Sequence, residues 1–327
     1  MENAIHFISG LPRAGSTLLS AILRQNPAFH AAMTSPVGAL YMALESAMSR
    51  RNEAAVFLDA GQRRALLRGV FAGYYVDADP AVVIFDTNRL WCARMGALAE
   101  LFPSARVICC VRDVSWIVDS IEQQAQRNPF ELSGLFGYEP GGTVYTRVAR
   151  VAGSDGMVGY ALDALREACF GAHAERLILL DYEALARAPG PTMRELYRLP
   201  GEPLFSHDFE HVAYEADAFD AALGAPGLHR VQGRVEWRPR PRVLPPDLFE
   251  RFTGDSFWRK PQPRLAHVPA SSGAGVAEHT GGRERLSWLI RAAAGSGRAR
   301  PGQCRTGRGW PVRGRGRIWA SRARSAP

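Results

Sequence analysis

Short apolar runs alternate with longer amphipathic stretches along the first 200 residues. Apolar runs of about four to eight residues that end at a turn signal are typical of buried strands, whereas apolar positions three or four residues apart are typical of helices. The runs predict four strands, at Ala4–Ser9, Ala81–Phe85, Arg106–Val111 and Arg176–Leu180. The amphipathic stretches predict helices at Leu18–Gln25, Pro36–Arg51, Gln62–Val76, Leu90–Phe102, Val114–Gln126 and Val158–Phe170. This alternation predicts an α/β fold, a doubly wound parallel sheet flanked by helices, with its site at the carboxyl ends of the strands.

The pattern changes twice toward the C-terminus. From about residue 203, prolines, histidines and aromatic residues break the periodicity and predict an irregular extension that wraps over the core to about residue 258. From residue 270, arginine, glycine, alanine, serine and proline dominate without a sustained apolar period, which predicts a disordered tail. We therefore expect an α/β domain at residues 1–269 and a tail at residues 270–327.

The charge of the chain is concentrated in this tail. Residues 270–327 carry 12 arginines and two acids, a formal charge of +10, which leaves −2 for the rest of a chain with a net charge of +8. The body is therefore not expected to bind nucleic acid, and an inert tail is favoured over a basic arm that binds it. Lys260 is the single lysine, so an anion site in this chain must be built from arginine, which favours forked grips on phosphate-like groups.

The cysteines and the apolar runs bear on the compartment of the protein. The five cysteines form no C-x-x-C pair, which predicts free and mostly buried thiols in a reducing compartment. No apolar run reaches the length of a membrane span, and the N-terminus has no signal-peptide pattern. These features predict a cytoplasmic protein without a membrane partner.

The turn after the first predicted strand has the frame of a phosphate-binding loop. Gly10 and Gly15 are separated by four residues, between a predicted strand and a predicted helix. Glycines there let successive N–H groups surround an anion, to which the helix presents its positive N-terminal end. A loop that binds Mg-ATP has a lysine at the position of Ser16, and Arg13 is the cation placed to replace it. The loop is thus suited to a phosphate-like group and poorly suited to Mg-ATP. With this loop, the predicted fold is a P-loop-type parallel sheet flanked by helices.

The segment LPRAGSTLLSAIL, which contains this loop, resembles the 5′-phosphosulfate loop of sulfotransferases. It is most similar to the branch that contains protein-tyrosine sulfotransferases and many bacterial relatives, which use 3′-phosphoadenosine-5′-phosphosulfate (PAPS). The resemblance implies that PAPS is the co-substrate and that no metal ion is required. The loop residues that it implies for binding are Arg13, Ala14, Gly15, Ser16, Thr17 and Leu18, with Arg13 also stabilising the leaving phosphate.

Two further motifs continue the resemblance to about residue 200. Arg112 follows the third predicted strand, and Ser120 lies about two helical turns later, so both side chains can reach one group. In the family, an arginine and a serine at this spacing bind the 3′-phosphate. Tyr182, in the sequence DYEAL, resembles the family's tyrosine that approaches the nucleotide. Arg230 is a further candidate for the 3′-phosphate site.

The sequence leaves the residue that takes the acceptor's proton open. Members of the family use a histidine on the second strand or a glutamate soon after the first helix, and the sequence MTSPV after this helix contains no acid. Asp86, at the end of the second predicted strand, is the acid–base candidate by position, and Arg89 is placed to stabilise the bridging oxygen. A helix cap is an equal alternative for Asp86. Glu45 is a third possibility for the base, and acids such as Asp220 indicate a solvated face.

The resemblance implies transfer of a sulfuryl group from PAPS to a hydroxyl or amine of a small-molecule or peptide acceptor. A P-loop kinase that uses a nucleoside triphosphate is the alternative enzyme, disfavoured by the missing lysine. A nucleotide-binding protein without catalysis is the other alternative, because no base is evident. A homodimer is a further expectation, since dimers are frequent in the family that the sequence resembles.

Overall fold

The structure is a computed structural model that describes residues 3–140, 142–260 and 263–270. Its centre is a six-stranded sheet with the strand order β2-β3-β1-β4-β5-β8, and every neighbouring pair is parallel. The strands are β1 (Ile5–Gly10), β2 (Phe29–Ala31), β3 (Val83–Thr87), β4 (Val107–Val111), β5 (Leu177–Asp181) and β8 (Ala266–Val268). The predicted α/β class with a parallel, helix-flanked sheet is confirmed.

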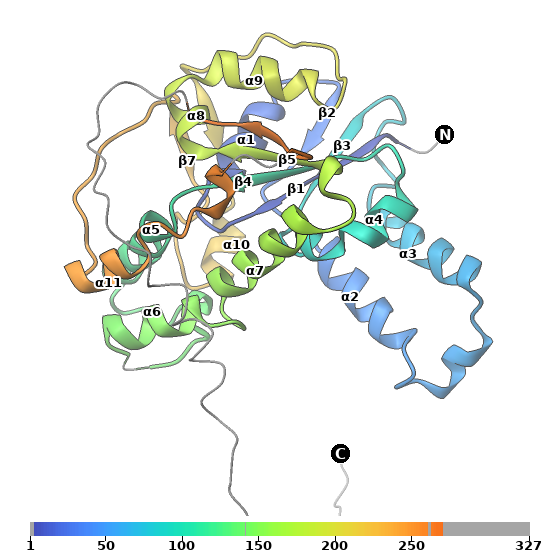
Figure 1. The fold of residues 1–327 in the computed structure, drawn as a ribbon, viewed down its shortest axis with the longest axis horizontal. Coiled ribbons are helices and arrows are strands. Elements are labelled where there is room, and N and C mark those ends of the chain that lie inside the picture. Colours follow the sequence, from blue (N-terminus) through green and yellow to red (C-terminus); the bar gives the residue numbers. More distant parts are fainter. Residues whose placement is uncertain (1–2, 141, 261–262, 271–327) are drawn as a thin grey trace, which may run out of the picture. The chain divides into compact units, whose positions relative to one another are not determined.

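Helices cover both faces of the sheet (Figure 1). The α-helices are α1 (Ser16–Leu23), α2 (Val37–Ala47), α3 (Ala60–Tyr74), α4 (Met95–Leu101), α5 (Val114–Arg127), α6 (Val144–Ala152), α7 (Met157–Phe170), α8 (Tyr182–Arg187), α9 (Pro189–Arg198), α10 (Asp217–Ala222) and α11 (Pro246–Arg251). Short 3₁₀ turns are η1 (Glu53–Phe57), η2 (Arg89–Arg94), η3 (Gly134–Phe136), η4 (Ala174–Arg176) and η5 (Phe257–Arg259). Helices α1 and α9 lie on one side of the sheet and α4 and α7 on the other, while α2 and α3 project from the body as a hairpin (Figure 1).

The strand register brings the loops of four strands to one edge of the sheet. In the pairing of β1 with β3, Ile8 is opposite Thr87, and in the pairing of β1 with β4, Gly10 is opposite Cys110. Val111 is opposite Asp181 where β4 pairs with β5. Because these strands are parallel and end together, the segments that follow β1, β3, β4 and β5 begin side by side.

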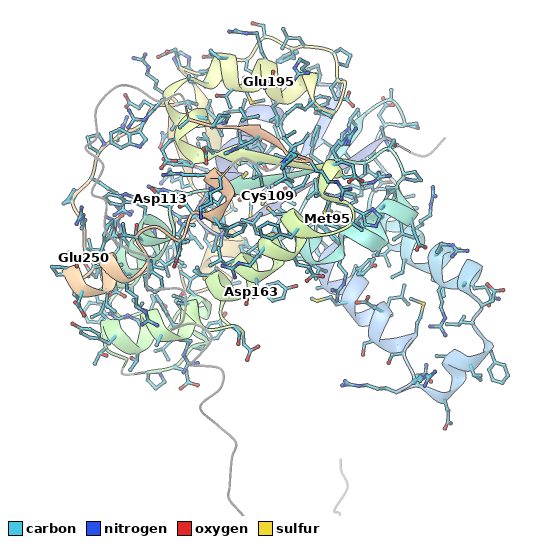
Figure 2. The ribbon with its side chains drawn as sticks, viewed as in Figure 1. Met95, Cys109, Asp113, Asp163, Glu195 and Glu250 are labelled. Atoms are coloured by element: carbon cyan, nitrogen blue, oxygen red, sulfur yellow. The ribbon has the colours of Figure 1, made fainter. Side chains whose placement is uncertain are left out.

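An aromatic cluster fills the space between the sheet and the α3–α4 side. Phe7 and Trp91 are fully buried with ring centroids 5.3 Å apart, and Phe71 meets Phe102 at 4.9 Å. Each buried ring of this kind stabilises a fold by about 1.5–3 kcal/mol relative to exposure. Figure 2 shows Cys109 within the sheet and Asp163 on the outer side of α7. Free, buried thiols were expected, and this is confirmed for the cysteines of the described residues: Cys92, Cys109, Cys110 and Cys169.

The sequence pattern missed two short strands of the sheet and several helices, among them the ten-residue α9. Strands β2 and β8 have three residues each, too few to show a period, and helix α6 was not predicted. The predicted extension is partly regular, because β6 (Val212–Tyr214) and β7 (Val231–Gly233) form an antiparallel pair within it. Strand β8 follows the extension and joins the main sheet. The predicted tail lies outside the described residues apart from Ala270, and so does Cys304. Among the described residues, no helix combines the length and the apolar character that crossing a membrane requires.

Candidate active site

The loop between β1 and α1 has the geometry of an anion cradle. Gly10 and Gly15 have φ angles of 105° and 95°, in the left-handed region that favours glycine. A Cβ on Gly10 would lie 2.4 Å from the carbonyl oxygen of Cys110, and one on Gly15 would lie 2.9 Å from the Tyr182 ring. No side chain caps the start of α1, and its first turn holds no acid, so its first N–H groups are left for a ligand.

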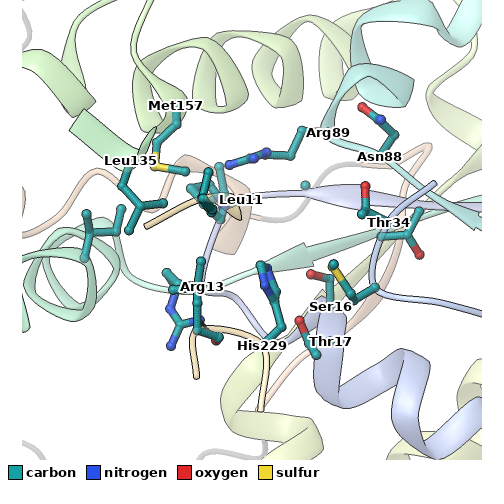
Figure 3. Close-up of a pocket in the computed structure, with 18 of the residues that line it drawn as sticks. Leu11, Arg13, Ser16, Thr17, Thr34, Asn88, Arg89, Leu135, Met157 and His229 are labelled. Carbon is teal, nitrogen blue, oxygen red and sulfur yellow. Dashed lines mark hydrogen bonds between the residues drawn. The ribbon is translucent and has the colours of Figure 1, made fainter. Parts of the chain in front are cut away.

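A cavity of about 670 Å³ opens above this loop, at the strand-end edge of the sheet. Figure 3 shows Arg13, Ser16, Thr17, Arg89 and His229 around it, contributed by three separate segments of the chain. Thr34 and Asn88 come from the segments after β2 and β3, and Met157 comes from the start of α7. The cavity therefore lies where the topology of a parallel α/β sheet places ligands.

Arg13 is held inside the loop by neutral groups. Its φ of 56° is unusual for a residue with a side chain, a kind of backbone strain that gathers at functional sites. Its Nε donates to Ser120 Oγ at 3.2 Å, and its Nη1 donates to the Leu228 carbonyl at 2.6 Å. Burial, together with the charge of Arg112, lowers the pKa of Arg13 to about 10. The guanidinium is still charged at neutral pH, without a carboxylate partner among the described residues.

Arg112 lies between the loop and Tyr182. Its guanidinium carbon is 4.4 Å from the centroid of the Tyr182 ring, and its Nη1 donates to the carbonyl of Arg13 at 3.4 Å. Its Nε is buried and has no hydrogen-bond partner in the described part of the chain. Burial lowers the pKa of Arg112 as well. A buried donor without a partner is costly, and an anion in the cavity would satisfy it.

Arg89 is the third cation of the cavity. It follows β3 at the start of η2, and its guanidinium extends over the end of β1 (Figure 3). Its backbone carbonyl accepts a hydrogen bond from Ser9 Oγ at 3.1 Å, but its guanidinium contacts no acid and makes no hydrogen bond within the ranges that the structure describes. Its side chain is accessible from the cavity, yet the surrounding protein removes enough water to lower its pKa. By contrast, Arg147 and Arg240 pair with the buried carboxylates of Glu122 and Asp119.

The structure brings most of the predicted binding residues together. Besides the three arginines, the residues of that set that line the cavity are Gly15, Ser16, Thr17, Leu18, Tyr182 and Arg230. Ala14 is a buried residue of the loop that does not line the cavity, and Ser120 reaches the site through its hydrogen bond with Arg13. Arg230 is half exposed and pairs with Glu215 at 3.0 Å, so its charge is less available to a ligand than the charges of the three arginines.

Asp86, in contrast, does not reach the cavity. It is fully buried, and its carboxylate accepts hydrogen bonds from Ser35 Oγ (2.6 Å), Tyr75 Oη (2.6 Å) and Trp91 Nε1 (2.8 Å). Burial raises the pKa of Asp86, and these three bonds oppose the shift. The alternative prediction, a helix cap, is wrong, because Asn88 Oδ1 accepts from the Leu90 N–H at the start of η2.

The other candidate base and the predicted solvated acids also have partners. Glu45, on α2, pairs with Arg94 at 3.0 Å and does not line the cavity. Asp220 was predicted to belong to a solvated face, and this is wrong, because it is 1% exposed. Its carboxylate accepts from the ring and from the backbone N–H of His229, at 2.5 and 2.8 Å.

His229 is a cavity residue that the sequence did not single out. Its neighbour Arg230 drew attention as a cation, while a lone histidine in a proline-rich, irregular segment has no periodic signal. The spacing of nine residues between Asp220 and His229 fits no helical or strand contact. The pair forms only because α10 and the turn before β7 fold back on each other.

The chain is similar in sequence to curated protein-tyrosine sulfotransferases. Protein-tyrosine sulfotransferase of Drosophila melanogaster is 23% identical over 209 residues, 62% of this chain and 39% of that protein. Protein-tyrosine sulfotransferase 1 of Danio rerio is 26% identical over 204 residues, 60% of this chain and 53% of that protein. The chain thus spans about half or less of the length of these curated relatives.

Solved sulfotransferase domains give distant structural matches. The domain from the curacin biosynthetic pathway is 16% identical, with a TM-score of 0.41 over 63% of this chain and 76% of that one. The domain from the Synechococcus PCC 7002 olefin synthase is 18% identical, with a TM-score of 0.40 over 77% and 96%. The model of the sulfotransferase family matches residues 6–206, which include the loop, Arg112 and Tyr182 and make up more than half of the chain. By that match, the protein belongs to the sulfotransferase family.

Proposed function

We propose that this protein transfers the sulfuryl group of PAPS to a hydroxyl or amine acceptor. The observation that carries the proposal is the set of Arg13, Arg89 and Arg112 around one cavity, each without an acid partner in the described residues. Three cations that share a partly desolvated site favour a ligand with several negative charges. A nucleotide with phosphates at both its 3′ and 5′ positions has such a distribution.

The loop and Arg13 are assigned to the 5′-phosphosulfate. As the bond between sulfur and the bridging oxygen breaks, negative charge grows on the leaving phosphate. Donors already fixed in position stabilise that charge without reorganisation, and the loop offers N–H groups and the hydroxyls of Ser16 and Thr17. Arg89, on the opposite side of the end of β1, is assigned to the bridging oxygen. This arrangement needs no metal ion to lower the barrier.

Arg112, Ser120 and Tyr182 are assigned to the 3′-phosphate and the nucleoside. The partnerless Nε of Arg112 supports this role, and the Tyr182 ring fixes the guanidinium plane by stacking. Ser120 Oγ, which receives the Arg13 hydrogen bond, links this subsite to the loop. Arg230 would add a cation at the edge of the same subsite. A kinase is less well supported, because Ser16 replaces the lysine that a transferring γ-phosphate requires.

The acceptor is proposed to be a small molecule or a peptide. The relatives are named protein-tyrosine sulfotransferases, so a tyrosine phenol is the first acceptor to test. Cytoplasmic location and a homodimer stay predictions from the sequence.

Calorimetry tests the donor. Titration with PAP, the desulfated product, and with ATP, each with and without magnesium, should give tight binding of PAP that magnesium does not change. Incubation with labelled PAPS and a pool of tyrosine peptides and phenols should then transfer the label. Tighter binding of ATP with magnesium would favour the kinase, and binding of PAP without release of PAP from PAPS would favour a protein that only binds nucleotides.

A further inference from the structure

The proposed reaction lacks a group that takes the acceptor's proton, and the cavity contains a buried histidine–aspartate pair. His229 Nδ1 lies 2.5 Å from Asp220 Oδ1, and the backbone N–H of His229 donates to Asp220 Oδ2 at 2.8 Å. Asp220 is 1% exposed, and the His229 side chain is 19% exposed, toward the cavity. Both carboxylate oxygens are thus used to hold one residue in one orientation.

This geometry fixes the tautomer of the ring. A carboxylate accepts, so Nδ1 carries the proton that it donates to Asp220, and Nε2 of the neutral ring is left with its lone pair. Nε2 has no hydrogen-bond partner among the described residues. Of the seven histidines in the described ranges, His229 is the one that lines this cavity. Figure 3 shows its ring between Arg13 and Ser16, directed toward the end of β1.

The surroundings keep the ring neutral. The charged groups that face it are Asp220 from α10, Arg13 from the loop and Arg89 from η2. Burial lowers the pKa of His229, the hydrogen bond and charge of Asp220 oppose that shift, and the two arginines add to it. At neutral pH the ring is therefore unprotonated and able to accept a proton.

We infer that His229 is the general base of the reaction and that Asp220 is its positioning residue. The inference rests on the proposed donor. Nε2 takes the proton of the acceptor hydroxyl while the hydroxyl oxygen forms its bond to sulfur. The bond between sulfur and the bridging oxygen breaks, and its electron pair stays on the 5′-phosphate of PAP. The products are the sulfate ester, PAP and a protonated His229, whose charge Asp220 then stabilises.

A purely structural role is the competing explanation, because Asp220 also ties the turn at His229 to α10. Glutamine at position 229 separates the two roles, since its amide donates to Asp220 but does not take up a proton. A matched control exists in His211, which pairs with Asp208 at 2.9 Å on the surface and lies outside the cavity. The variants are therefore His229→Gln, Asp220→Asn and His211→Gln, each in the full chain.

Release of PAP from PAPS is the readout, because every acceptor, water included, produces it. It is measured with water alone, with phenol and with 4-nitrophenol, a more acidic phenol, and affinity for PAP is measured separately by calorimetry. We expect His229→Gln to bind PAP as the unchanged protein does and to lose about 100-fold or more in turnover. The loss should be smaller with 4-nitrophenol, which gives up its proton without a base. His211→Gln should behave as the unchanged protein.

The pH profile distinguishes positioning from structure. In the unchanged protein, turnover should rise with pH through the His229 pKa, below 6.5, and then level off. Asp220→Asn should lower turnover and shift the pH at which turnover rises. His229→Gln should abolish this rise. Equal turnover and equal profiles in His229→Gln and the unchanged protein would overturn the inference and leave the donor in place. So would an unchanged protein that binds PAP but releases none from PAPS. If the unchanged protein does not bind PAP, the donor itself is wrong.

Discussion

Two groups of buried ionisable residues lie at the same edge of the sheet, and they differ in whether the protein supplies all their hydrogen-bond partners. At the end of β3, the Asp86 carboxylate has three protein donors and no access to the cavity. At the ends of β1 and β4, Arg13 and Arg112 have neutral partners, and one buried nitrogen has none. A satisfied charge stabilises the fold, whereas an incompletely satisfied one is available to a ligand. Position at the strand ends is therefore not enough to identify a functional residue.

The largest effect expected from this contrast is on turnover. Arg13→Ala should reduce release of PAP from PAPS about 100- to 1,000-fold, because it removes charge stabilisation at the leaving phosphate. It should not lower the free energy of unfolding, since burial lowers the pKa of Arg13 to about 10 and its charge is unfavourable in the fold. Arg198→Ala, at an exposed arginine of α9, is the matched control. Unchanged turnover in a folded Arg13→Ala protein would remove this residue from the site.

Replacement of Asp86, in contrast, should change the stability of the protein. Asp86→Ala should lower the free energy of unfolding by about 3 kcal/mol, because it leaves the donors of Ser35, Tyr75 and Trp91 without their acceptor. Urea unfolding measures the change, and Asp163→Ala, at an exposed acid of α7, should be near neutral. The folded fraction of Asp86→Ala should bind PAP normally. A normal stability combined with lost turnover would restore Asp86 as an acid–base candidate.

Arg112 allows the two phosphates to be told apart. Arg112→Ala should weaken PAP about 10- to 100-fold, in line with the loss of a charged hydrogen bond. Binding of adenosine 5′-phosphosulfate should change little, because that ligand has no 3′-phosphate. Arg230→Ala should have a much smaller effect on PAP, since Arg230 is exposed and already paired with Glu215. Equal losses for both ligands in Arg112→Ala would make its role structural.

For His229 we expect an effect smaller than those above, on the pH dependence of the free energy of unfolding. Its pKa in the fold is below 6.5, so under mildly acidic conditions the unfolded chain binds a proton that the folded chain does not. This contribution to the free energy of unfolding is complete above pH 6.5 and is lost as the pH falls through the folded pKa. Urea unfolding between about pH 5 and 8 should show a flatter profile for His229→Gln than for the unchanged protein. A steeper profile for the variant would contradict the assignment.

The smallest effect is expected from removal of residues 271–327. Arg13, Arg112 and Asp86 all lie within the described residues. In the structure, the N–H of Ala270 donates to Asp181 Oδ2 at 3.1 Å. A chain that ends at Ala270 retains β8 and should melt within a few degrees of the full chain and bind PAP equally well. Weaker PAP binding after truncation would show that binding by Arg13 and Arg112 depends on the tail.

The sequence predicted the loop, Arg112 and Tyr182 because their signals are local. Gly10 and Gly15 need positive φ angles at a turn between a strand and a helix, and only glycine adopts these readily. Arg112 and Ser120 are two helical turns apart, so their proximity follows from helix geometry. Strands β2 and β8 escaped prediction because three residues do not show a period, and their pairing with β3 and β5 is non-local.

The parallel α/β sheet and a phosphate-type loop built around an arginine can be predicted from the residue pattern. Which charged residues have hydrogen-bond partners within the protein depends on how the chain folds. Asp86 and Asp220 are both acids beside apolar residues, yet one is closed off by Ser35, Tyr75 and Trp91, and the other orients His229 toward the cavity. The physical reason is that burial and hydrogen-bond partners come from segments distant in the chain, and these decide whether a charge holds the fold together or faces a ligand.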